Sequence, residues 1–215
     1  MENQNTQQPE RKKGKGCLTA IVIFIFLGIL GSCLGESEDS AEGTTQAETS
    51  TKVESTTQES TTEKEDKNEK KRKEAKEIDE QFTDIARKTD ASYGKLLNGI
   101  QKIGDNEQNA NILEFYNLAK AVKEDCFLYF REANHISYKG AENYKDSLLT
   151  YITTCQSVAE NFMKYIDKSE MKYLSKAQEL MEAKNTIALQ LATDELQFLS
   201  DSGFTTDEID KMLNK

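Results

Sequence analysis

Apolar residues recur every three or four positions along most of this chain, and no proline follows Pro9 to interrupt them. Four such stripes run from Ile78 to Ile103, from Ile112 to Ile136, from Ala141 to Tyr165 and from Tyr173 to Phe198. This spacing places one apolar face on each of four helices, whereas a half-buried strand alternates with a period of two. Because each face must be buried against another element, the stripes predict an all-α protein.

Short polar segments separate the stripes, at residues 104–106, around Gly140 and at residues 167–169. Long helices with short connections pack as antiparallel neighbours. We therefore predict an antiparallel bundle of three to four long helices with coiled-coil-like packing. The fourth stripe is the weakest, because Lys184 and Asp194 interrupt it. Its helix is expected to pack at the periphery, or these two polar residues fix its register.

The C-terminal residues carry clear local signals for a helix end and a helix start. Gly203 is placed to end the fourth helix in a left-handed conformation. Thr205 and Glu208 have the spacing of a capping box, and Phe204 can pack on Ile209. A short final helix is therefore expected.

A basic segment at residues 1–16 precedes an uncharged apolar run from Leu18 to Leu34, and acidic residues follow from Glu36. Basic residues on one flank place that flank in the cytoplasm. We therefore expect residues 17–35 to attach the chain to a membrane, with everything after them on the extracytoplasmic side.

The apolar run has two interpretations. It is seventeen residues long, which is short for an uncleaved single span of about 20 residues. Alternatively it is a signal peptide, because Leu30-Gly31-Ser32-Cys33 resembles a bacterial lipobox. Cleavage there would leave Cys33 as a lipidated N-terminus. Both interpretations attach the same domain to the same side of the membrane.

The sequence Lys13-Gly14-Lys15-Gly16-Cys17-Leu18-Thr19 leads into this Ile- and Phe-rich run. It resembles the anchor of many small membrane-anchored or lipobox-bearing surface proteins of Gram-positive bacteria. The resemblance covers only the anchor and the segment after it, and it implies no active site.

Residues 36–62 are rich in Ser, Thr and acidic side chains, and Val53 is their only large aliphatic residue. Such a segment cannot bury enough apolar surface to fold, so it is predicted to be a disordered linker. Residues 63–77 are rich in Glu, Lys and Arg, which favours a solvated helical extension of the domain at 63–215. The basic cluster at residues 70–73 is interpreted as one face of that helix, with contact to an anionic surface as the alternative.

The sequence offers little for catalysis. The single histidine, His135, lies at the expected end of the second helix, where a cation is favourable. No other His or Cys has metal-ligand spacing, and there is no Gly-rich phosphate loop. Among the carboxylates, only Asp194 falls on an apolar stripe. We therefore expect no metal, no cofactor and no enzymatic activity.

Residues 78–215 contain sixteen basic and twenty-three acidic side chains. An acidic domain repels the phosphate backbone, so nucleic acid is not an expected partner.

Two cysteines lie on facing stripes. Cys126 and Cys155 are equidistant from a point beside Gly140, so in a hairpin that turns there they lie at the same height. Thiols so placed outside the cell should oxidise, and we expect a disulfide. The alternative is two buried free thiols. A turn centred two residues earlier would offset them by about 6 Å, too far for good disulfide geometry.

The second helix carries apolar residues beyond its stripe, including Phe127 and Phe130. A helix that is apolar on more than one face is usually buried between neighbours. We therefore expect these side chains in the core, with an exposed patch for a partner as the alternative.

These features favour a membrane-tethered interaction module that binds a protein or an envelope component. One alternative is a structural surface protein that self-associates through a coiled coil of its first helix, which Ser92 and Gly99 would weaken. Another is the ectodomain of a sensor with a separate transducing protein, because the cytoplasmic segment is too short for a signalling domain.

Overall fold

The structure is a computed structural model that describes residues 59–105 and 111–213. These residues form helices α2 (Glu59–Asp105), α3 (Ile112–His135), α4 (Glu142–Lys168), α5 (Met171–Asp201) and α6 (Thr206–Leu213). No strand occurs within the described ranges, which confirms the predicted all-α bundle.

Several predictions from the sequence concern residues outside these ranges. The basic segment at 1–16, the anchor at 17–35 with Cys33, and all but the last residues of the linker at 36–62 lie there. The helical domain begins earlier than expected, because α2 starts at Glu59, four residues before position 63.

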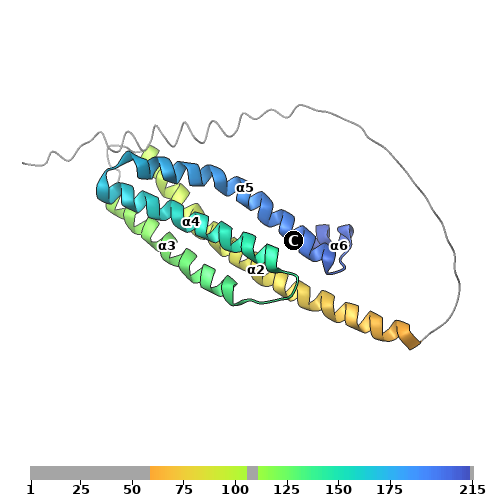
Figure 1. Ribbon diagram of the computed structural model, residues 1–215. Coiled ribbons are helices and arrows are strands. Elements are labelled where there is room, and N and C mark those ends of the chain that lie inside the picture. Colours follow the sequence, from red (N-terminus) through yellow and green to blue (C-terminus); the bar gives the residue numbers. More distant parts are fainter. Residues whose placement is uncertain (1–58, 106–110, 214–215) are drawn as a thin grey trace, which may run out of the picture.

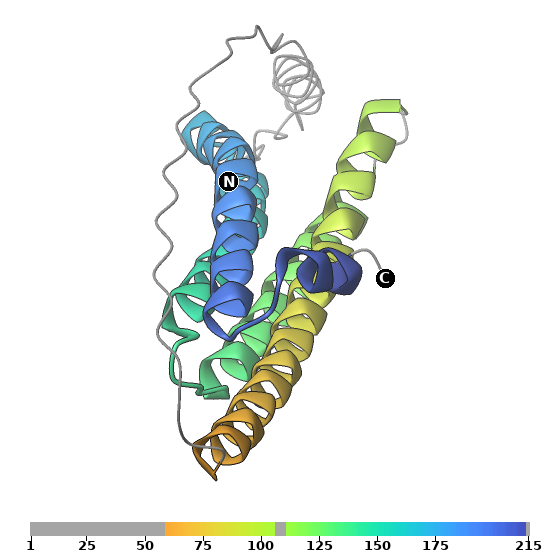
Figure 2. The same cartoon turned by 90° about the vertical axis from the view of Figure 1, so that its right-hand side faces the viewer.

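The longest helix, α2, runs along the whole bundle and extends beyond the other helices at its N-terminal end (Figure 1). The three helices that follow lie side by side and alternate in direction (Figures 1 and 2). Helix α4 packs along α3 on one side and along α5 on the other, and it also contacts α2. This order matches the short connections read from the sequence.

The predicted stripes supply the core. Phe82, Ile85 and Leu96 of α2 are at most 1% exposed. The buried residues of α3 and α4 on their stripes are Phe115, Ala119, Val122, Cys126, Ala133, Tyr144, Leu148, Tyr151, Cys155, Val158, Phe162 and Tyr165. Burial of these faces provides the main stabilisation of the bundle.

The central helix is α4 and not α3, contrary to the expectation that the second helix is buried between neighbours. Ten residues of α4 are buried, against five of α3. Helix α4 contacts three long helices, whereas α3 contacts only α2 and α4. One side of α3 therefore faces solvent, and the apolar residues beside its stripe lie there.

The predicted end of α5 at Gly203 and the short final helix are confirmed. Gly203 has a φ of +91°, and the Phe204 N–H donates to the Leu199 carbonyl at 3.2 Å, which ends α5 as predicted. The Thr205 N–H donates to Glu208 Oε2 at 2.9 Å, half of the predicted capping box.

Candidate functional site

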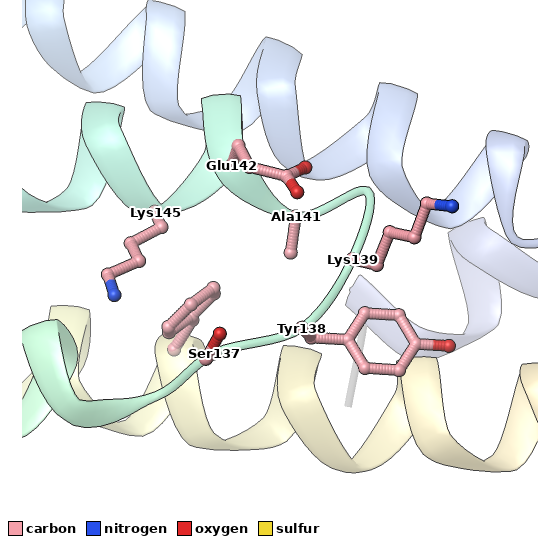
Figure 3. Close-up of a pocket in the computed structure, with 7 residues that line it drawn as sticks. Ser137, Tyr138, Lys139, Ala141, Glu142 and Lys145 are labelled. Carbon is pink, nitrogen blue, oxygen red and sulfur yellow. The ribbon is translucent and has the colours of Figure 1, made fainter.

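An open pocket of about 240 Å³ lies beside the connection between α3 and α4 (Figure 3). Its lining residues are Phe82, Ser137, Tyr138, Lys139, Ala141, Glu142 and Lys145. Two of its three ionic side chains, those of Lys145 and Glu142, bond to the chain itself. Lys145 Nζ donates to the carbonyls of Asn134 and Ile136, each at 2.7 Å, and Glu142 accepts from the Gly140 N–H at 2.8 Å. These contacts stabilise the end of α3 and the turn, so the pocket has a structural role.

Metal-binding chemistry is not assembled in the part of the chain that the structure describes. No group of three or more His, Cys, Asp or Glu side chains there could hold a metal ion. His135 is the last residue of α3 and is exposed.

The expected disulfide between Cys126 and Cys155 is not formed, and both residues are buried free thiols. Cys126 lies nine residues before the end of α3 at His135, while Cys155 lies thirteen residues after the start of α4 at Glu142. The two cysteines therefore lie at different distances along the chain from the connection between α3 and α4. Burial raises the pKa of each thiol to about 12, so both behave as small apolar side chains.

Two carboxyl groups, the buried Asp79 and the partly buried Glu195, lie where α2, α4 and α5 meet. Asp79 is 5% exposed, and Tyr144 OH donates to its Oδ1 at 3.5 Å. Thr83 Oγ1 donates to Glu195 Oε1 at 3.5 Å. Burial, and then the nearby charge of Glu195, raises the pKa of Asp79 to about 7. Burial also raises the pKa of Glu195.

The sequence analysis missed this carboxyl pair. It singled out Asp194, which is only partly buried and accepts hydrogen bonds from Ser147 and from Gln190. Asp79 follows the apolar Ile78, and Glu195 follows Asp194. A shift of one residue is about 100° around a helix, so the spacing of the stripe gave no sign that these two carboxylates face inward.

Lys184 occupies a polar site inside the bundle. Its side chain is 15% exposed, and its Nζ lies 3.2 Å from Asp90 Oδ1. The same Nζ lies 5.0 Å from the ring centroid of Tyr93 and 4.6 Å from that of Tyr151. Contacts to α2 and α4 thus hold α5 at one height, which agrees with the interpretation that its polar stripe positions fix the register.

The basic cluster at residues 70–73 packs partly against the C-terminal helix. Lys71 Nζ donates to the Asp201 carbonyl at 2.7 Å. The Arg72 guanidinium pairs with Glu208 and lies 4.7 Å from the ring centroid of Phe204. Two of the four basic side chains therefore bind the end of α5 and the start of α6.

The candidate partner residues on α3 lie in different environments. Phe127 is 52% exposed, which corrects the expectation that it belongs to the core. Its neighbour Leu128 is 57% exposed, whereas Phe130 is partly buried and packs against the core. Arg131 lies one turn further along the exposed side and has no ion pair within the described residues. We call Phe127, Leu128 and Arg131 the α3 patch.

Comparison with protein-family models, with curated proteins and with solved structures finds no match to this chain. No helix among residues 59–105 and 111–213 is long and apolar enough to cross a membrane.

Proposed function

We propose that this chain is a membrane-tethered, extracytoplasmic interaction module that binds a protein partner through the α3 patch. The observation that carries the proposal is the exposure of two adjacent large apolar side chains, Phe127 and Leu128, beside Arg131, which forms no ion pair with any residue that the structure describes. Aromatic side chains and arginine dominate the binding energy of protein interfaces.

The composition of the patch specifies the kind of partner. A surface that covers Phe127 and Leu128 must offer an apolar pocket, and a carboxylate at its rim would pair with Arg131. The sequence before α2 supports an extracytoplasmic location of the bundle. The one-sided basic flank at residues 1–16 favours a cytoplasmic N-terminus, and the linker separates the bundle from the membrane.

The test is site-specific photo-crosslinking in intact cells. A photo-crosslinking amino acid in place of Phe127 should attach the full chain to a second protein. The same amino acid in place of Leu113, which is 69% exposed on the same helix outside the patch, is the matched control. A defined heavier product at 127 that is missing at 113 supports the proposal.

The second part of the experiment removes the apolar contacts of the α3 patch by substitution. The variant Phe127→Ser/Leu128→Ser removes the exposed apolar surface and leaves the core unchanged. It should abolish partner binding without changing the helical content of the chain. Equal crosslinking at positions 127 and 113, or full binding by the double variant, would contradict the proposed role of the patch.

A further inference from the structure

Over much of its length, the exposed face of α5 carries no charge, although charged residues normally lie on the solvent side of a helix. Ten residues between positions 183 and 200 are exposed, and none of them is charged: Ala183, Asn185, Thr186, Leu189, Gln190, Ala192, Thr193, Leu196, Gln197 and Ser200. In a chain in which 31% of the residues are charged, an ordinary solvent-facing helix would carry charges on this side.

The charged residues of the same stretch are directed into the bundle. Lys184 pairs with Asp90, Asp194 accepts from Ser147, and Glu195 accepts from Thr83. Meanwhile Leu189 is 71% exposed and Leu196 is 43% exposed. Exposed leucines on a face without charge, beside charged side chains that turn inward, indicate that another surface covers this face.

The exposed residues have the spacing of a helix-pairing seam. Thr186, Leu189, Thr193 and Leu196 follow one another at intervals of three, four and three residues, which is the coiled-coil period. Small and large side chains alternate along it. Leucines from a facing helix could therefore pack over the two threonines.

We propose that the outer face of α5 is a homodimer interface, in which α5 of a second copy packs antiparallel to it about a two-fold axis at Leu191. In that register Leu189 lies opposite Thr193 of the second copy, and Leu196 lies opposite Thr186 of the second copy. Each layer then joins one large and one small side chain. The symmetry repeats both contacts, as a two-fold interface requires.

Charge explains why the occupant is a second copy. Residues 78–215 carry seven more acidic than basic side chains. A self-contact elsewhere on this surface would bring like charges together, which disfavours association. The uncharged face of α5 avoids that repulsion, whereas a basic partner would be attracted to the acidic surface instead.

The size of the face indicates a weak dimer. Eighteen helical residues span about 27 Å, and one helix pair of that length lies near the lower limit of stable interfaces, about 1,200 Å². Tethering two chains to one membrane raises their effective concentration and compensates for a small interface. Dimerisation should therefore be strongest with the chains in a membrane.

The experiment uses the full chain in membranes, with two differently tagged copies co-expressed. Copies carrying Leu189→Cys and Thr193→Cys should form a disulfide-linked heterodimer under mild oxidation, because these positions lie at the same height. Copies that both carry Leu189→Cys would have their cysteines offset by about 6 Å along the helix axes, and they should crosslink much less. The unsubstituted chain, oxidised in parallel, measures the background from its four own cysteines.

A second variant tests the interface without added thiols. Energy transfer between labelled copies in membranes should fall to the monomer level in Leu189→Glu/Leu196→Glu. It should be unchanged in Leu113→Glu, a variant of an equally exposed leucine on α3. The proposal is overturned if both variants behave alike, or if crosslinking between positions 189 and 193 stays at background. Crosslinking of a partner at position 127 is measured in a separate experiment. A negative result for the α5 dimer therefore leaves the proposed function of the α3 patch untouched, and the reverse also holds.

Discussion

At the scale of single residues, the Asp79–Glu195 pair is the least conventional feature of the bundle. The two carboxyl groups come from α2 and α5, and their hydrogen-bonding neighbours are the hydroxyl groups of Thr83 and Tyr144. None of the ion pairs found among the described residues gives either carboxylate a cation. Burial without a counter-charge favours the protonated form, which is why the pKa of Asp79 is raised to about 7.

The sign of the resulting pH dependence follows from that shift. Between the ordinary value of 3.8 and about 7, the folded chain binds more protons at Asp79 than the unfolded chain does. The free energy of unfolding should therefore fall as pH rises through this window and level off above it.

Replacing Asp79 by Asn should remove this penalty. We expect Asp79→Asn to stabilise the full chain in detergent by about 1–3 kcal/mol at pH 8 and to have little effect at pH 4. Thermal unfolding at both pH values measures the difference. The control is Asp146→Asn on α4, whose side chain is exposed. A variant at position 79 that is destabilised at pH 8 but not at pH 4 would show that the carboxylate is needed in its charged form.

At the scale of elements, α6 packs against α5, and side-chain contacts from Arg72 connect it to α2. An eight-residue helix is too short to be stable alone in water. Apart from the buried Ile209, its contacts with the bundle include the ion pair of Arg72 with Glu208 and the stacking of Arg72 on Phe204. Backbone and side-chain hydrogen bonds from Thr205, and then the bond from Arg72, lower the pKa of Glu208 to about 2.

Removal of Arg72 should release α6 locally. In Arg72→Ala, the backbone amides of residues 206–213 should exchange with solvent roughly five- to tenfold faster, while those of α4 keep their protection. Hydrogen exchange followed by mass spectrometry measures both helices in one sample. Lys73→Ala is the matched control, because Lys73 is exposed on the same turn of α2. Unchanged exchange in Arg72→Ala would mean that packing against α5 and the burial of Ile209 hold the helix without Arg72.

The stabilising effect of Glu208 has its own pH window. Because its folded pKa is lowered from 4.5 to about 2, the contribution is complete above about 4.5 and is lost as pH falls towards 2. Lowering the pH towards 2 should therefore release α6 in the unsubstituted chain. At Asp79 the effect is the opposite, because protonation removes the cost of a buried charge.

At the scale of the whole molecule, the N-terminal end of α2 extends beyond the other helices, and the proposed linker and anchor precede it (Figure 1). The α3 patch and the uncharged face of α5 lie on helices that α4 separates. The two proposed interfaces therefore do not compete for the same helix. One chain could bind a partner through α3 while it pairs with a second copy through α5.

The proposed topology predicts which side of the membrane carries the bundle. Protease added to intact protoplasts should degrade the domain at 63–215, because the basic flank at residues 1–16 favours a cytoplasmic N-terminus. Immunoblotting with an antibody against the bundle measures the loss, and a cytoplasmic protein in the same cells should remain intact. Protection of the bundle until lysis would reverse the topology.

The form of the anchor is measured on the same membranes. Intact mass distinguishes a chain that begins near Met1 from one that begins at a lipidated Cys33, and Cys33→Ala should block processing only in the second case.

The spacing of apolar residues determined the helical class, the approximate ends of the long helices and most of the core, because a period near 3.6 residues is that of an α-helix with one buried face. Local chemistry likewise determined the helix end at Gly203 and the capping box of Thr205 and Glu208. A stretch without charge, from Asn185 to Thr193, was also visible in the sequence. Only the structure shows that this stretch forms an exposed face without charge, because the side chains of Lys184 and Glu195 turn into the bundle.

The relations between helices were decided only in three dimensions. Among the described helices α3 contacts only α2 and α4, and this left Phe127 exposed although its residue type suits a core. Cys126 and Cys155, which the sequence placed at one height, are both free thiols. Asp79 and Glu195 are 116 positions apart along the chain. Periodicity specifies which side of a helix is buried, but the packing partner of that side depends on the relative height and rotation of whole helices, which no local pattern contains.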